Sequence, residues 1–178
     1  MSGRITCIDA LKSNPKMIYV GAASGGVWKS ENGGASWASI FDDQPILNIG
    51  SVAITQSNPS IVWAGTGEGN PRNSVSLGEG IYKSLDGGKT WNKILYVNEE
   101  TGCADIAMHP TKPETLFASM WQFRRKAYAF SSGGPGSGLH KSTDGGKTWN
   151  KITNGLPEGD LGRIVITINP SKPSEVLA

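Results

Sequence analysis

The chain contains GGVWKSENGGASW at residues 25–37, EGIYKSLDGGKTW at residues 79–91 and SGLHKSTDGGKTW at residues 137–149, three copies of one pattern. The pattern is Ser-x-Asp-x-Gly-x-Thr-Trp, and the first copy has Asn32 and Ser36 in place of Asp and Thr. An Asp or Asn side chain accepts hydrogen bonds from turn amides, and the Gly pair supplies positive φ, so each copy predicts a β-hairpin turn. We call these segments the repeat turns.

Each repeat turn ends in a tryptophan, which predicts that the ring packs beneath the turn. We therefore expect all three rings to be buried, each against its own hairpin, and assign the repeat turns a structural role. The defining residues are Ser30, Asn32, Gly34 and Trp37 in the first turn, Ser84, Asp86, Gly88 and Trp91 in the second, and Ser142, Asp144, Gly146 and Trp149 in the third.

A second landmark is a proline turn followed by a short apolar strand, as in SNPKMIYVG, SNPSIVWAG, TKPETLFAS and SKPSEVLA. Another apolar segment precedes each of these turns. One unit therefore consists of strand A, the proline turn, strand B, a loop, strand C, the repeat turn and strand D. Four antiparallel strands make one propeller blade. The sequence predicts an all-β propeller with three full blades, at about residues 3–41, 48–97 and 102–154, and the start of a fourth at 161–178.

The composition agrees with short strands joined by tight turns, since the 178 residues include 24 Gly and 10 Pro. The 17 basic and 15 acidic residues are spread along the chain and give a net charge of +2, which argues against a nucleic-acid partner. No stretch approaches the roughly 20 apolar residues of a membrane span, and the first residues lack the pattern of a signal peptide. We expect a soluble chain with no membrane partner.

Cysteines and histidines are too few to suggest a reactive or metal site. Cys7 and Cys103 cannot form a disulfide framework and lie too far apart for a local metal site, so we expect buried free thiols. His109 and His140 occupy repeat positions on strands or turns, which gives no support to a zinc or Ser-His-Asp site. The sequence predicts no metal and no cofactor.

The repeat turns resemble the Asp-box, or bacterial neuraminidase repeat, of a group of propellers that includes sialidases, xyloglucan-active glucanases and sortilin-type receptor domains. The chain resembles in particular the bacterial sortilin-like, glycosyl hydrolase-like propeller family, through VGAASGGVWKS, FDDQP, GTGEGNPRNS and SGGPGSGLHKSTDGGKTW. The resemblance covers essentially the whole chain and implies a partial propeller from an exported parent family. A sialidase would begin with the motif Arg-Ile-Pro, whereas here Arg4 and Ile5 are followed by Thr6. The resemblance therefore departs from the sialidase pattern at this position.

The spacing of the landmarks shows which loops vary. From repeat-turn Ser to the next landmark Pro there are 29, 29 and 31 residues, whereas from Pro to Ser there are 15, 25 and 29, so the growth lies between strands B and C. Connections in an antiparallel meander alternate ends, so the B-to-C loops share one face with the connections between blades, opposite the repeat turns. Variable loops on a rigid scaffold usually carry function. We call this side the loop face, at residues 41–45, 66–79, 121–138 and 156–160.

Carboxylates on the loop face are the candidate catalytic residues. Glycoside hydrolysis uses two carboxylates about 5–10 Å apart, and Asp42, Asp43 and Glu68 could supply them, with Glu79 nearby. The alternative is that the short Asp side chains cap the loop.

Candidate ligand-binding residues combine aromatic rings, cations and an amide, a mixture that suits sugar stacking or anion binding. They are Trp121, Arg124, Arg125, Tyr128, Asn70 and Arg72. Alternatively, the rings cover the edge of a blade and the cations are solvated. Arg4 and Arg163 share a Gly-Arg-Ile context and either bind an anion in the central channel or pair with acids, of which pairing is favoured.

Three functions follow as alternatives. The favoured one is a non-catalytic module that binds carbohydrate or a protein segment through the loop face. The second is a fragment of a glucanase-like glycoside hydrolase whose remaining blades are missing, and the third is a structural or assembly unit. Since an open stack of blades exposes strand edges and apolar faces, we also expect a homo-oligomer, most simply a two-fold dimer.

Overall fold

The computed structural model describes residues 4–70 and 75–178, and the regular elements in these ranges are all strands. They form four antiparallel sheets, which confirms the predicted all-β class and partial propeller. The strands are β1 (Ile5–Ala10), β2 (Ile18–Ala22), β3 (Val27–Ser30), β4 (Ala38–Ser39), β5 (Ile49–Ile54), β6 (Val62–Thr66), β7 (Ile81–Ser84), β8 (Asn92–Leu95), β9 (Thr101–Met108), β10 (Leu116–Lys126), β11 (Ala129–Ser132), β12 (Gly138–Ser142), β13 (Asn150–Ile152), β14 (Thr167–Ile168) and β15 (Val176–Leu177).

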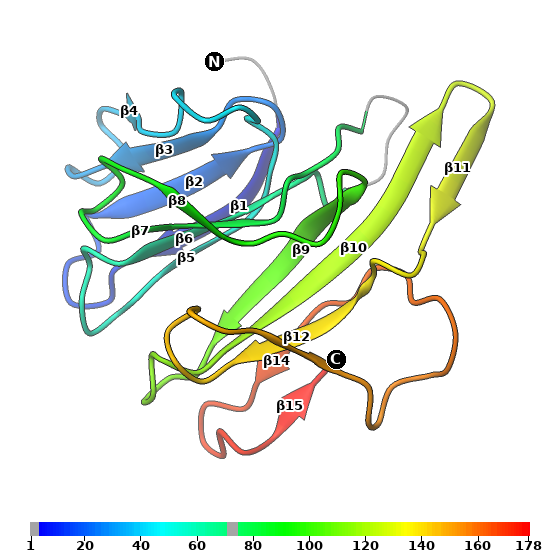
Figure 1. The fold of residues 1–178 in the computed structure, drawn as a ribbon. Coiled ribbons are helices and arrows are strands. Elements are labelled where there is room, and N and C mark those ends of the chain that lie inside the picture. The colour runs from blue at the N-terminus through cyan, green and yellow to red at the C-terminus, as the bar shows by residue number, and fades with distance from the viewer. Residues whose placement is uncertain (1–3, 71–74) are drawn as a thin grey trace.

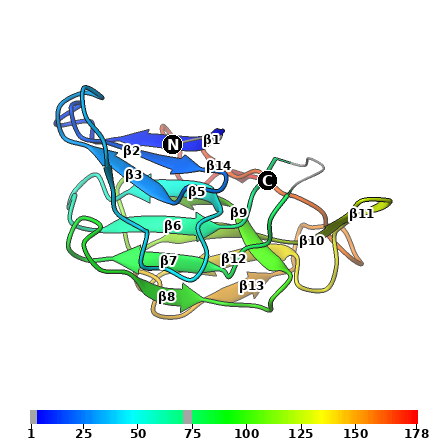
Figure 2. The same ribbon diagram turned by 90° about the horizontal axis from the view of Figure 1, so that it is seen from above.

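Each sheet is one blade. The first has the order β1-β2-β3-β4 and the second β5-β6-β7-β8. In the third, β10 pairs with β9 and β12, β12 pairs with β13, and β11 extends the end of β10; the fourth contains β14 and β15. The inner strands β1, β5 and β9 lie side by side although they belong to different sheets. Figures 1 and 2 show the blades following one another in chain order.

A β-bulge recurs at the same register in the inner strand of each complete blade. Bulges re-aim the side chain next to them. In the second and third blades the side chain after the bulge accepts a hydrogen bond from a main-chain amide of the following blade. Ile106 N donates to Ser51 Oγ (3.1 Å), and Ile166 N donates to Asp105 Oδ2 (2.9 Å). These bonds join successive blades at their inner edges.

Blades pack so closely that strand B has no room for a side chain at one position. A Cβ on Gly21 would lie 2.5 Å from Ile49 Cγ2, and a Cβ on Gly65 would lie 2.9 Å from Cys103 Cβ. Both distances are shorter than any normal carbon contact. The core between blades is apolar, with Tyr19 and Trp63 among its largest buried rings.

Hydrogen bonds close each repeat turn as the pattern predicts. In the second turn Asp86 accepts from Thr90 Oγ1 (2.7 Å), Thr90 N (2.9 Å) and Ser84 Oγ (2.8 Å). Asp144 and Thr148 make the same bonds in the third turn. The threonine hydroxyls and turn amides stabilise the ionised carboxylates, so the pKa values of Asp86 and Asp144 lie well below the ordinary range.

The first repeat turn keeps this geometry without a charge. Asn32 Oδ1 accepts from Ser36 N (2.9 Å), and Asn32 Nδ2 donates to Ser36 Oγ (2.8 Å). Gly33 and Gly34 have φ angles of 72° and 91°, which the turn requires and which L side chains rarely adopt.

The repeat-turn tryptophans differ from expectation, since Trp37, Trp91 and Trp149 are half-buried rather than buried. Trp91 packs on the preceding blade, where Nε1 donates to Ile40 O (2.7 Å) and the ring meets Phe41 edge-on at 5.0 Å between centroids. Trp149 packs against the core shared by the second and third blades. The repeat turns lie at the outer edge of the blades. Trp91 and Trp149 therefore each fill the junction between two blades and leave one face of the ring exposed to solvent.

The two ends of the blades differ as the meander predicts. At one end the first glycine of each repeat turn donates its amide hydrogen to an A-to-B turn carbonyl: Gly33 to Lys16, Gly87 to Ser60 and Gly145 to Glu114, at 2.9, 2.8 and 2.9 Å. At the other end Gly26 N donates to Leu47 O (2.8 Å) and Gly67 N to Asn48 O (2.6 Å). The B-to-C loops therefore meet the connections between blades.

Cys7 and Cys103 are free thiols, as expected; Cys103 is buried and Cys7 is half-buried. Desolvation raises the pKa of Cys7 to about 11 and raises that of Cys103 further. Both thiols are therefore protonated and poorly nucleophilic near pH 7. Across residues 4–70 and 75–178, no helix is long and apolar enough to span a membrane.

Candidate functional site

A buried acid opens the long loop of the second blade. Glu68 lies two residues after β6 and is only 2% exposed, and its carboxylate pairs with the guanidinium of Arg4, just before β1. Glu68 N also donates to Ser76 O (3.2 Å), which ties the two arms of the loop together. Arg4 thus pairs with an acid, the favoured of its two expected roles. Its side chain remains 36% exposed, and its Nε has no hydrogen-bond partner in the described part of the chain.

The loop of the third blade is a hairpin formed by β11 and the end of β10, and it projects beyond the rest of its sheet (Figure 1). Trp121 and Phe123 lie at its base, 1% and 2% exposed, with ring centroids 4.4 Å apart. Val75 and Leu77 from the loop of the second blade pack against this pair. The ring of Trp121 is therefore covered by the neighbouring loop and does not present a stacking surface. It covers the edge of a blade, which was the alternative to a role in sugar stacking.

A hollow of about 330 Å³ lies on the loop face between this hairpin and the loops of the second blade. We call it the loop-face hollow; its lining is Ile46, Asn48, Val75, Ser76, Leu77, Arg124, Arg125 and Lys126. Arg124 Nη1 lies 4.0 Å from Glu100 Oε1, and the Arg125 guanidinium lies over the Phe130 ring at 5.6 Å. The hollow therefore combines cations, one side-chain amide and an apolar strip.

The candidate carboxylates do not converge on this hollow. Asp42 and Asp43 are exposed on the connection between β4 and β5, and Ser39 Oγ donates to Asp42 Oδ1 at 2.5 Å. Glu79, at the end of the second-blade loop, pairs with Lys93 at 2.7 Å. None of these residues lines the hollow.

The remaining ligand-binding candidates lie at the edges of the loop face. Tyr128, at the hairpin tip, is 85% exposed, and Lys126 Nζ lies 6.0 Å from its ring centroid. Asn70 is exposed at the end of the first described range. Arg72 lies outside the described residues. The structure thus brings Arg124 and Arg125 together with the second-blade loop and leaves Tyr128 apart.

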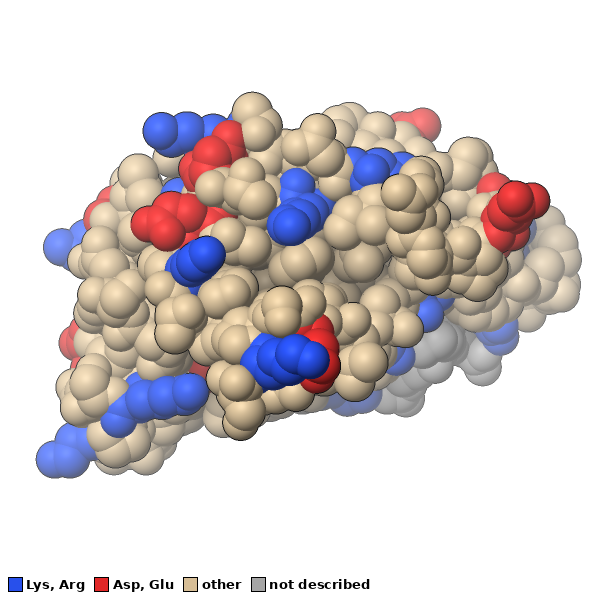
Figure 3. Space-filling model, turned by 90° about the horizontal axis from the view of Figure 1, so that it is seen from below, with Lys and Arg blue, Asp and Glu red and all other residues tan. Residues whose placement is uncertain are grey.

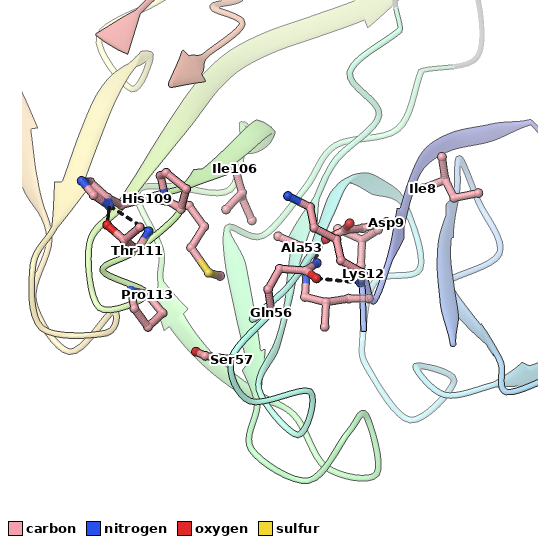
Figure 4. A pocket seen from close by; sticks show the side chains of 14 residues that line it. Ile8, Asp9, Lys12, Ala53, Gln56, Ser57, Ile106, His109, Thr111 and Pro113 are labelled. Atoms are coloured by element: carbon pink, nitrogen blue, oxygen red, sulfur yellow. Dashed lines mark hydrogen bonds between the residues drawn. The ribbon is translucent and has the colours of Figure 1, made fainter. Parts of the chain in front are cut away.

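A larger pocket of about 620 Å³ lies among β1, β5 and β9 toward the repeat-turn end (Figure 4). Its polar groups are engaged in local structure. Asp9 accepts from Ala10 N (2.8 Å) and Ile54 N (2.7 Å), Gln56 accepts from Lys12 N (2.9 Å) and donates to Ala10 O (3.1 Å), and His109 Nδ1 accepts from Thr111 N (3.3 Å) and Lys112 N (3.1 Å). These bonds fix the A-to-B turns and the blade junction, so Asp9, Gln56 and His109 have structural roles in this pocket. Its lining repeats from blade to blade, since Ile8, Val52 and Ile106 hold equivalent positions in strand A, and it includes the landmark Pro113.

Charge gives no further guide to a site. On the side seen in Figure 3, acidic and basic side chains are interspersed among uncharged ones. Within the described residues, no group of three or more His, Cys, Asp or Glu side chains is placed to hold a metal ion.

Comparison with known proteins points to one group of enzymes. No protein-family model matches the chain. It is 25% identical over 182 residues to a xyloglucanase of Hypocrea jecorina (strain QM6a), an alignment that covers 85% of this chain and 20% of that protein.

The solved structures agree. The fold matches an ancestral GH74 enzyme with a TM-score of 0.74 and 21% identity, over 98% of this chain and 21% of that one. It matches a Niastella koreensis GH74 enzyme with a TM-score of 0.70 and 22% identity (95% and 24% covered), and the GH74 xyloglucanase from Xanthomonas campestris with a TM-score of 0.68 and 15% identity (95% and 25% covered). The chain spans a quarter or less of these proteins, and the likeness establishes its β-propeller fold.

Proposed function

We propose that this chain is part of a β-propeller glycoside hydrolase that acts on a xyloglucan-type β-glucan, and that its loop face binds the polysaccharide. The observation that carries the proposal is the likeness to a xyloglucanase in sequence, together with the likeness to GH74 enzymes in fold over nearly the whole chain. This favours the hydrolase fragment over the non-catalytic module that the sequence alone favoured. The repeat turns then make the chain an Asp-box propeller of the hydrolase type rather than the sortilin type.

The loop-face hollow suits a ligand rich in hydroxyl groups. Sugar sites combine apolar surface with a few placed donors and acceptors. Arg124, Asn48 and Ser76 offer polar groups, and Val75 and Leu77 offer the apolar strip. Binding therefore rests on side chains from two adjacent blades.

We assign different roles to the candidate carboxylates of the loop face. Hydrolysis needs two carboxylates about 5–10 Å apart on either side of the scissile bond. Glu68 is buried and paired with Arg4, so we assign it to positioning Arg4 and the second-blade loop. Asp42 and Asp43 are exposed and remain the catalytic candidates of this chain, with the pair completed by other blades of a longer protein.

The experiment is calorimetric titration of the chain with a xyloglucan oligosaccharide, beside cellohexaose as the unbranched comparison. We expect xyloglucan to bind, and Arg124→Gln to weaken binding by about tenfold, the worth of one hydrogen bond to a charged group. Lys147→Gln, in the third repeat turn at the opposite end, is the matched control and should bind as the wild type does. Absence of binding to folded protein, or equal weakening by both variants, would contradict the proposal.

A further inference from the structure

The two loops that frame the loop-face hollow contain no acidic residues. Neither residues 69–78 of the second blade nor residues 121–138 of the third blade include Asp or Glu. Three consecutive cations, Arg124, Arg125 and Lys126, line the hollow, and none of the described residues that line it is acidic. The lining therefore carries three positive charges, although the net charge of the whole chain is only +2.

The acids at the two ends of the second-blade loop pair with other cations. Glu68 is buried and pairs with Arg4, and Glu79 Oε2 lies 2.7 Å from Lys93 Nζ. Neither carboxylate lines the hollow. These acids therefore do not balance the positive charge of the hollow.

Glu100 compensates Arg124 only weakly. Its Oε1 lies 4.0 Å from Arg124 Nη1, and its Oε2 accepts from Gln122 Nε2 at 3.3 Å. The Arg124 and Glu100 side chains are 50% and 42% exposed, so water and salt screen their attraction. Lys126 has no acidic partner in the part of the chain that the structure describes. A guanidinium group and an ammonium group therefore remain available to a ligand.

The hairpin of the third blade positions these cations. β10 and β11 pair as a ribbon that projects beyond the rest of the sheet (Figure 1). Successive side chains of a strand point to opposite faces, and residues two apart are separated by about 7 Å, so Arg124 and Lys126 share one face of the ribbon. The Arg125 guanidinium lies 5.6 Å from the Phe130 ring, and Lys126 Nζ lies 6.0 Å from the Tyr128 ring. Aromatic rings attract cations at these distances, so they hold two of the three cations at the hollow.

We propose that the loop-face hollow binds the carboxylate of a uronic acid unit, so that the glucan recognised by this chain carries acidic sugars. The planar guanidinium of Arg124 can donate two parallel hydrogen bonds to one carboxylate, and Lys126 adds a second positive charge. The Ser76 hydroxyl, which has no hydrogen-bond partner in the described residues, adds a neutral donor from the second-blade loop. Val75 and Leu77 supply the apolar surface for the sugar ring. The inference rests on the proposed function for the glucan chain and adds the charge of its substituents.

The test compares two probes that differ in charge but not in backbone. They are cellohexaose and the same chain with each C6 hydroxyl group oxidised to a carboxylate. Calorimetric titration measures the dissociation constant of each. We expect the oxidised chain to bind at least about tenfold more tightly in about 50 mM NaCl, the factor that a hydrogen bond to a charged group represents. The preference should shrink in about 500 mM NaCl, because salt screens exposed charges.

Variants connect the preference to the hollow. Arg124→Gln combined with Lys126→Gln should abolish the preference for the oxidised chain, and both side chains are exposed, so the variant should keep the urea midpoint of the wild type. Lys147→Gln, at the opposite end of the third blade, is the matched control and should keep the preference. A preference that survives in the double variant would overturn the proposal.

Two further ligands give the remaining outcomes. Hexaaspartate carries as many side-chain carboxylates as the oxidised chain but no sugar, and equally tight binding of this peptide would overturn the proposal because charge alone would then explain the result. A xyloglucan oligosaccharide separates this inference from the proposed function. If it binds and the oxidised chain binds no better than cellohexaose, the uronate site is wrong and the proposed function stands. If the oxidised chain binds tightly and the xyloglucan oligosaccharide does not bind, the assignment to xyloglucan is wrong and the uronate site stands.

Discussion

Removing the tryptophan of the second repeat turn tests whether these rings hold blades together. Trp91 is half-buried. Its Nε1 donates to Ile40 O of the preceding blade, and its ring makes an edge-to-face contact with Phe41. Trp37 ends the first repeat turn, where no preceding blade receives it. Substituting each with alanine therefore separates the contribution of a blade junction from that of the turn alone.

The magnitude follows from the contacts. Half of a tryptophan surface is about 100 Å², worth about 2.5 kcal/mol at the usual transfer value. The lost hydrogen bond to Ile40 adds about 1 kcal/mol. We therefore expect Trp91→Ala to cost about 3–4 kcal/mol and Trp37→Ala about 1 kcal/mol, both from urea unfolding followed by circular dichroism. Equal losses from the two variants would refute the reasoning, because the junction would then contribute nothing.

The other predictions concern an ion pair, blade spacing, acid stability and assembly. Glu68→Gln should lower the free energy of unfolding in urea by about 2–3 kcal/mol, because it leaves Arg4 unpaired. The double variant Arg4→Met with Glu68→Leu should recover most of this loss. An unchanged free energy of unfolding for Glu68→Gln would show that the pair does not form. Gly65→Ala should cost about 1–3 kcal/mol through overpacking against Cys103, and a neutral result would mean that the blades lie further apart. The lowered pKa values of Asp86 and Asp144 contribute stability that is complete above about pH 4 and is lost as pH falls toward their folded values. Replacing both aspartates with Asn should flatten the fall in urea midpoint below pH 4; an unchanged slope would contradict this. Some apolar side chains are exposed, such as Ile8, which is 67% exposed, so we expect light scattering to show a dimer. A well-dispersed monomer would show that these side chains are stable in contact with water.

The local part of this fold could be predicted from the sequence because its signals are local. A Ser, an Asp and two glycines within five residues are enough to define a turn, and all three repeat turns have the expected hydrogen bonds. The alternation of ends in a meander then places the long loops together. These inferences need no knowledge of which blade contacts which.

Contacts between blades could not be predicted, because their partners are far apart in sequence. Arg4 and Glu68 are 64 residues apart, and nothing in either segment identifies the other. The sequence makes Trp121 a candidate for sugar stacking, and nothing near it in the sequence indicates that Val75 and Leu77 of another blade pack against it. The same holds for Trp91, whose partner Ile40 lies 51 residues earlier.

The most direct test of the proposed function is a chimera in which this chain replaces the aligned segment of the Hypocrea jecorina xyloglucanase. Reducing ends released from xyloglucan measure activity, and binding of a xyloglucan oligosaccharide shows that the chimera is folded. Our account predicts that the chimera hydrolyses xyloglucan and that Asp42→Asn with Asp43→Asn lowers the rate by at least about tenfold without loss of binding. A folded chimera that binds the oligosaccharide but releases no reducing ends, or one unaffected by these substitutions, would contradict it.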